Sequence, residues 1–306
     1  MDITLIICTF NRAASLETTL GSIQNLALPA SLRWEILVVD NNSTDSTREV
    51  VEQFAAASGL NVLYLFEKRQ GKSYALNTGI REARGGIIAF ADDDVTFDRN
   101  WLVSLKQALD GWGCIGVGGK IIPVWSHAAP PWLQMDGQQA VGHFDIGEKP
   151  REINFAHGAN GAFKRESFEK YGLFQVETGP DGKARGGYED DEFGARLNRH
   201  GEKIMYAPAA VVYHPVEPEK LNKAYFRKWF YDTGRAMMWA RIWPPETVLY
   251  FGIPRFLFGA LVQNSVKWPF TLDEKRRFRR ECQAWRAAGG ILEGGRMLLG
   301  KRWKSA

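Results

Sequence analysis

The chain has 306 residues, of which 45% are hydrophobic and 24% are charged. This composition suits one large folded domain or a domain with an appendage, and it excludes a disordered or low-complexity chain. The net charge is +4, but residues 267–306 carry 11 basic and 4 acidic side chains, whereas the preceding part is slightly acidic. The tail therefore favours an anionic partner.

Short apolar runs alternate with helical patterns through the first half of the chain. The runs rich in Val, Ile and Leu, which predict buried strands, are 3–8, 34–40, 62–66 and 86–91. The segments with helical spacing between them are 15–24, 46–57 and 73–83. This order predicts an α/β fold with a mostly parallel sheet, in which ligands bind at the carboxyl ends of the strands.

The second half is mixed. A further strand is expected at 116–122, followed by a long irregular segment at 123–150, and segments of that length are usually functional. Later elements are a helix at 189–200, strands at 203–206 and 210–213, and an amphipathic helix at 220–243 that ends before two prolines.

The strongest chemical signal is the triplet Asp92, Asp93 and Asp94, which directly follows an apolar run. Adjacent carboxylates repel each other unless a cation lies among them. Mg²⁺ and Mn²⁺ prefer carboxylate oxygens and bridge to diphosphates, so a metal site is one interpretation. A solvated acidic turn is the other.

Polar residues also follow the first three predicted strands. Thr9, Asn11 and Arg12 follow the first, and Asp40 ends the second, where it can bind a base or ribose or cap the next helix. Lys72 lies in a glycine-containing loop after the third and offers a cation to phosphate, unless it belongs to a solvated basic loop.

A second acidic cluster, Glu189 to Glu192, crowds the first turn of a predicted helix. The helix dipole stabilises anions there, so the cluster is either structural or contains a general base. Arg196 is expected to pair with one of these acids. His214 ends a predicted strand and is either structural or a metal ligand beside the triplet.

Seven segments occur in this order: CTFNR, VVDNNSTD, QGKSYALNTGI, FADDD, GANGAFKRESFEKYGLF, YEDDEF and AVVYH. Together they resemble family 2 glycosyltransferases. The resemblance implies the Rossmann-like GT-A fold and inverting, metal-dependent transfer of a hexose from a nucleotide sugar. UDP is the expected nucleotide, and dTDP and GDP are the alternatives. It implies a GT-A catalytic domain at 1–216, with a nucleotide-sugar half at 1–115 and an acceptor half at 116–216, and a basic helical appendage at 217–306.

The resemblance also assigns roles to residues. Asp190 would be the catalytic base, and Asp94 and His214 would bind Mn²⁺ or Mg²⁺. The residues that would hold the nucleotide sugar are Thr9, Asn11, Arg12, Asp40, Lys72, Asp92, Asp93 and Asn160, with Asp40 on the base and Asn160 facing the pocket. Glu189, Asp191 and Arg196 would support the base and the acceptor. The acceptor would be a glycan or a lipid-linked carrier, as in polysaccharide biosynthesis, and no nucleic-acid partner is expected.

The cysteines and both ends of the chain give expectations about where in the cell the protein is located. Three scattered cysteines support neither a disulfide framework nor a zinc site, and the first residues lack a secretory signal, so we expect a cytoplasmic protein. The apolar segment 249–270 is interrupted by polar residues, so it predicts a helix at an anionic membrane surface, on the inner face, rather than a spanning helix. Packing of this segment on the catalytic domain is the alternative.

Two other functions remain open from the residues. A sugar nucleotidyltransferase also uses carboxylates and a metal, but it needs a glycine-rich phosphate loop that the N-terminal segment lacks. A nucleotide-sugar-binding protein without transfer activity is the second alternative. Such a protein is expected to have lost a metal ligand or a base, and Asp94, Asp190 and His214 are all present.

Overall fold

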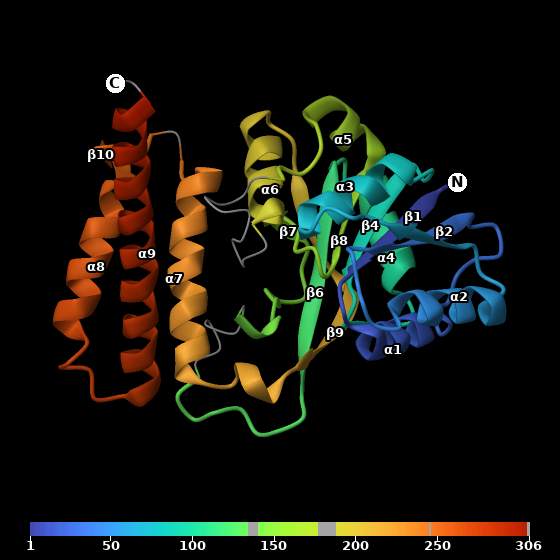
Figure 1. The fold of residues 1–306 in the computed structure, drawn as a ribbon, viewed down its shortest axis with the longest axis horizontal. Coiled ribbons are helices and arrows are strands. Elements are labelled where there is room, and N and C mark those ends of the chain that lie inside the picture. Colours follow the sequence, from blue (N-terminus) through green and yellow to red (C-terminus); the bar gives the residue numbers. More distant parts are fainter. Residues whose placement is uncertain (134–139, 177–187, 245, 305–306) are drawn as a thin grey trace. The chain divides into compact units, whose positions relative to one another are not determined.

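The computed structural model describes residues 1–133, 140–176, 188–244 and 246–304 (Figure 1). The described residues form two compact units. The first unit comprises 1–124, 143–176 and 189–215, and the second comprises the remaining described residues.

The first unit is built on one large sheet. Its strands are β1 (Ile3–Thr9), β2 (Trp34–Asp40), β3 (Val62–Phe66), β4 (Ile87–Asp92), β5 (Thr96–Phe97), β6 (Gly116–Trp125), β7 (Arg151–Ile153), β8 (Gly161–Lys164) and β9 (Ile204–Val216). The order is β3-β2-β1-β4-β8-β6-β9-β5, and β7 pairs with β9. The first four strands are mutually parallel, as predicted, and antiparallel pairing begins at β8.

Helices cover both faces of this sheet. The helices of the first unit are α1 (Ala13–Ile23), α2 (Thr47–Ser58), α3 (Lys72–Glu82), α4 (Trp101–Gly111), α5 (Arg165–Tyr171) and α6 (Glu189–Arg199). Alternate residues of a strand point to opposite faces. Leu5 and Ile7 accordingly pack with α1, α2 and α4, whereas Ile6 packs with α3, α5 and α6. Two hydrophobic cores therefore enclose the parallel strands.

Some observed elements differ from the predicted ones. The strands expected at 203–206 and 210–213 are one continuous strand, β9, because the chain stays extended through Pro208. The helix expected at 220–243 is α7 (Lys223–Ala240), and it begins at an Asn222 cap whose side chain accepts a hydrogen bond from the Tyr225 amide.

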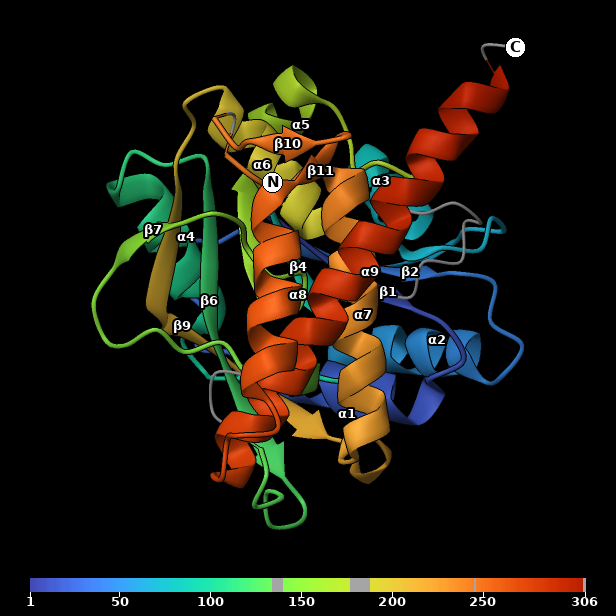
Figure 2. The same ribbon diagram turned by 90° about the vertical axis from the view of Figure 1, so that its left-hand side faces the viewer.

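The second unit contains the expected C-terminal helices. These are a short 3₁₀ turn (Pro218–Lys220), α7, α8 (Arg255–Lys267) and α9 (Glu274–Lys304), with a small hairpin of β10 (Leu249–Tyr250) and β11 (Ile253–Pro254). Figure 2 shows α7, α8 and α9 side by side. Trp132, Phe226 and Phe278 form one aromatic cluster of this unit. Among the described residues, no helix combines the length and the apolar character needed to cross a bilayer. The division of the chain at residue 216 into catalytic domain and appendage, and of the catalytic domain into two halves, stays a prediction.

Candidate active site

The candidate site lies in the first unit, where parallel strands end. Thr9 at the end of β1 is in register with Asp40 at the end of β2, and Cys8 is in register with Asp92 at the end of β4. The carboxyl ends of the three strands therefore meet at one edge of the sheet. This is the edge at which open α/β sheets bind ligands.

Thr9, the last residue of β1, and Arg12, in the loop that follows, hold the acidic triplet in place. The Thr9 hydroxyl donates a hydrogen bond to Asp93 Oδ2 over 2.7 Å. Arg12 Nη1 donates to Asp93 Oδ1 over 3.0 Å and to Asp94 Oδ2 over 2.8 Å. Asp93 is buried, and burial raises its pKa. Thr9 and Arg12 thus contact the triplet directly, and the guanidinium offsets the repulsion between adjacent carboxylates.

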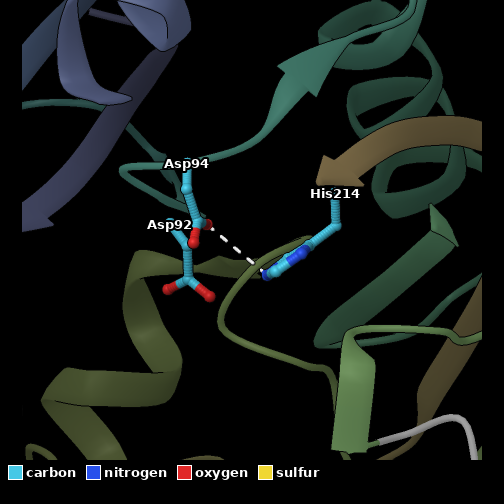
Figure 3. Close-up of side chains that lie close together, drawn as sticks. All are labelled: Asp92, Asp94 and His214. Atoms are coloured by element: carbon cyan, nitrogen blue, oxygen red, sulfur yellow. Dashed lines mark ion pairs between the residues drawn. The ribbon is translucent and has the colours of Figure 1, made fainter. Parts of the chain in front are cut away.

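Asp94 and His214 point toward each other (Figure 3). Asp94 Oδ1 is buried and accepts no hydrogen bond from the described residues, and His214 Nε2 lies 3.5 Å from it. His214 Nδ1 lies 2.9 Å from the Pro215 carbonyl oxygen, which can only accept a hydrogen bond. In the neutral ring, Nδ1 therefore carries the proton and Nε2 presents a lone pair toward Asp94.

Asp92 completes a group that fits a divalent cation. Asp92, Asp94 and His214 each offer one ligand atom, and these atoms all lie within 4.8 Å of one another. Two carboxylates and a neutral imidazole are a donor set that Mn²⁺ and Mg²⁺ accept. The buried Asp94 oxygen without a hydrogen bond is the observation that favours a cation here, because buried acceptors normally have a partner.

Lys72 at the start of α3 connects this group to the second acidic cluster. Its Nζ lies 2.7 Å from Asp92 Oδ1 and 3.8 Å from Glu189 Oε1. Partial desolvation of Lys72, whose side chain is 40% exposed, disfavours its charge, but the carboxylates of Asp92, Glu189 and Asp190 outweigh that effect and raise the pKa of Lys72. Burial likewise opposes ionisation of Asp92, yet Lys72 lowers the pKa of that carboxyl. The lysine is therefore a permanent cation between the two acidic clusters.

Asp190 lies in the first turn of α6 and is held by the backbone of a neighbouring loop. The Gly158 amide donates a hydrogen bond to Asp190 Oδ2 over 2.6 Å. A Cβ atom at position 158 would lie 3.0 Å from that oxygen and 3.3 Å from Lys72 Nζ, so the loop approaches closely because residue 158 is glycine. Burial and then the charge of Glu189 raise the pKa of Asp190, against the opposing effects of Lys72 and Gly158.

Asp40 is held by both of its oxygens. The Ser43 amide donates to Oδ1 over 2.8 Å, and the Tyr64 hydroxyl donates to Oδ2 over 2.7 Å. Asn11 has a left-handed backbone, with φ of 51°, and its Oδ1 accepts a hydrogen bond from the Thr44 amide. Asn11 therefore joins the loops after β1 and β2.

The structure does not support the expectation that Asn160 faces a donor pocket. Asn160 is fully buried, and its side chain accepts a hydrogen bond from Trp101 Nε1 and donates to the carbonyl oxygens of Lys120 and Ala210. Its amide group is saturated by core partners and is not available to a sugar. Asn160 instead joins α4 to strands β6 and β9.

Arg196 pairs with one acid of the α6 cluster, as predicted, and that acid is Glu192. Both side chains are mostly buried, and Arg196 also donates to the carbonyl oxygens of Tyr171 and Leu173. Arg196 thus anchors α6 to the segment after α5. Asp191 is half-buried in the same turn as Asp190, and its support of the acceptor stays a prediction.

Two further residues shape this edge: Tyr64, which lies outside the seven segments, and Asn41, which directly follows Asp40 in VVDNNSTD. Tyr64 is in register with Val38, two residues before Asp40, so the two-residue period of strands places Tyr64 and Asp40 on one face of the sheet. Asn41 donates to the carbonyl oxygens of Glu67 and Arg69 and accepts from the Gly71 amide. It shapes the loop that leads to Lys72. That contact depends on tertiary structure, and no sequence pattern signals it.

With this geometry established, the comparisons define the class of protein. Residues 4–172 match the family described as Glycosyl transferase family 2. This match spans more than half of the chain, and the chain belongs to glycosyl transferase family 2. The family excludes the nucleotidyltransferase alternative and confirms the glycosyltransferase class expected from the sequence.

Individual relatives agree with this class. The chain is 27% identical over 226 residues to Glycosyltransferase AglE of Haloferax volcanii, which covers 74% of this chain and 71% of that protein. It is 26% identical over 231 residues to Succinoglycan biosynthesis protein ExoM of Rhizobium meliloti, a match that covers 75% of this chain and 72% of that protein. In structure it is similar to mannosyltransferase PcManGT of Pyrobaculum calidifontis, solved with GDP-Man and Mn²⁺, with a TM-score of 0.64, 19% identity and coverage of 95% and 86%. The fold is the expected GT-A fold.

Proposed function

We propose that this family 2 glycosyltransferase is a metal-dependent, inverting enzyme that moves a hexosyl group from a nucleotide sugar to a hydroxyl group. The observation that carries the proposal is the position of Lys72. One lysine lies 2.7 Å from Asp92 and 3.8 Å from Glu189, the neighbour of Asp190. A cation site and a general base therefore share one site, although they are about a hundred residues apart in sequence.

Asp92, Asp94 and His214 are the residues that would hold Mn²⁺ or Mg²⁺. When bound, the cation neutralises the charge that develops on the departing diphosphate. Arg12 fixes the orientation of Asp94 through one carboxylate oxygen and leaves the other, Oδ1, without a hydrogen bond from the described residues. The PcManGT structure contains Mn²⁺, which supports a metal in a related fold.

Asp190 is the proposed general base. Oδ2 is held by the Gly158 amide, and Oδ1 would take the proton of the acceptor hydroxyl. As that proton moves to Asp190, the hydroxyl oxygen bonds to the anomeric carbon, and the bond from that carbon to the diphosphate oxygen breaks. A single displacement of this kind inverts the anomeric configuration and requires no enzyme nucleophile. The raised pKa of Asp190 increases its affinity for the proton.

The nucleotide would bind at the ends of β1 and β2. Asp40 is fixed there by Ser43 and Tyr64 and would accept hydrogen bonds from the base. UDP is the nucleotide that the family resemblance favours, whereas the PcManGT neighbour holds GDP-Man. The acceptor would be a glycan or a lipid-linked carrier at the inner face of the membrane. The name of the ExoM relative supports a role in polysaccharide synthesis.

Nucleotide release tests the proposal directly. UDP-, GDP- and dTDP-sugars are incubated with the full chain and glycan or lipid-linked acceptors, in Mn²⁺, Mg²⁺ or EDTA, and free nucleoside diphosphate is measured. We expect release with one nucleotide class, dependent on the cation and stimulated by an acceptor. Donor binding in a thermal-shift assay without release under any condition would contradict the proposal and would instead support a nucleotide-sugar-binding protein.

A further inference from the structure

The outer face of α8 in the second unit is apolar and exposed. Leu257 is the only residue of this helix that is fully buried. On the opposite side, the side chains of Phe256, Val262 and Val266 are 48%, 63% and 59% exposed. Val262 and Val266 are one helical turn apart, so they lie on one face of the helix. In Figure 2 this helix faces the viewer.

The turn from α8 to α9 extends this apolar surface. Phe270 is 81% exposed and Leu272 is 95% exposed, and Trp268 beside them is half-exposed. Large side chains at this level of exposure, next to one another in one turn, are typical of a binding surface. A groove of about 350 Å³ between α8 and α9 opens beside Trp268 and is lined mainly by apolar residues, including Leu261 and Trp285.

Positive charge surrounds the apolar turn. Residues 267–280 contain six basic and two acidic residues, a net charge of +4. The two acids are already engaged, because Asp273 accepts a hydrogen bond from the Arg276 amide and Glu274 pairs with Lys223. Lys275, Arg276 and Arg277 are exposed. The turn therefore presents apolar side chains beside the exposed cations Lys275, Arg276 and Arg277.

We propose that the outer face of α8 and the turn at 268–272 dock onto an anionic lipid bilayer. Aromatic and aliphatic side chains that enter the interface beside Lys and Arg are the combination that such membranes bind. A second copy of the chain is a poorer occupant, because a symmetric dimer through this face would set the same cations against each other. The docking surface does not depend on the transfer reaction proposed above, since membrane binding is measured without a donor or an acceptor.

Flotation of the full chain with vesicles tests the docking surface. One set of vesicles is phosphatidylcholine alone, and the other also contains phosphatidylglycerol. We expect binding only to the anionic vesicles, with a loss of at least about tenfold in the double variant Val262→Ser, Val266→Ser. Ser and Val have similar helix propensities and both valines are exposed, so the helix is preserved. A second double variant, Arg276→Glu with Arg277→Glu, is expected to lose binding to the anionic vesicles to a similar extent.

The matched control is Leu63→Ser, which removes an exposed apolar side chain of β3 in the first unit. It is expected to bind vesicles like the wild type, and circular dichroism checks the folding of every variant. Equal binding of the wild type and the α8 double variant would overturn the proposal. The proposal would also be overturned if the folded wild type did not bind anionic vesicles. It would likewise be overturned if the wild type formed a dimer that the valine substitutions abolish and bound no lipid.

Discussion

Asp94 follows β4 and Asp190 lies in the first turn of α6, and the two carboxylates have very different neighbours. Asp94 has Arg12 on one oxygen, and His214 Nε2 lies 3.5 Å from the other. Asp190 has the backbone amide of Gly158 on one oxygen and the acidic Glu189 beside it in the chain. The first setting favours binding of a cation, and the second favours binding of a proton. Chemically identical groups would thus acquire the separate roles proposed for them through their surroundings.

Removal of the proton acceptor is expected to have the largest effect. Asp190→Asn keeps the shape of the side chain and its hydrogen bond from Gly158 but cannot take a proton at neutral pH. We expect transfer to fall by on the order of 10²–10⁴-fold with donor binding retained. Rates of nucleotide release and donor-induced thermal shifts measure the two properties. Glu169→Gln, an exposed change on α5, is the control, and near-normal turnover of Asp190→Asn would remove this residue from the role.

Loss of a proposed metal ligand is expected to be the next largest effect. His214→Ala deletes Nε2 from the group that also contains Asp92 and Asp94. The concentration of Mn²⁺ for half-maximal activity should rise by on the order of 10- to 100-fold, with partial recovery of activity at high Mn²⁺. A metal titration of activity measures this, with the exposed His127→Ala as control. An unchanged titration curve would show that His214 is not a ligand.

The negative charge of Glu189 is expected to shift the pH below which activity falls. The base acts in its ionised form, so activity should fall as the pH decreases through the raised pKa of Asp190. Burial is the first cause of that raised pKa and Glu189 is the second, so Glu189→Gln should move the limb toward lower pH. Profiles of kcat against pH, with the exposed Glu17→Gln as control, measure the shift. A limb that moves to higher pH would contradict the assigned electrostatics.

The smallest effect is expected at the nucleotide end of the site. Tyr64→Phe removes the hydroxyl that donates to Asp40 Oδ2. A hydrogen bond of this kind contributes about 1 kcal/mol, so the KM for the donor should rise severalfold with little change in kcat. Steady-state kinetics with Tyr250→Phe as control measure it. An unchanged KM for the donor would show that the hydrogen bond to Asp40 does not contribute to donor binding.

The parallel half of the fold was predictable because its signals are local. Each of the first four strands is a short apolar run that ends in or is followed by a polar residue, and Asp40 and Asp92 are the last residues of β2 and β4. The positions of Asn160 and Gly158 were not predictable in the same way. Asn160 is turned inward by Trp101, Lys120 and Ala210, which come from three distant segments. The motif around Asn160 identifies the family but not the direction of the side chain.

The close approach of Gly158 to Asp190 and Lys72 has a consequence for protein engineering. A methyl group at this position would meet both a carboxylate oxygen and an ammonium group within 3.3 Å. Libraries that aim to alter sugar preference should therefore keep position 158 fixed, because even alanine would require the Asp190 carboxylate or the Lys72 ammonium group to move by a few tenths of an ångström.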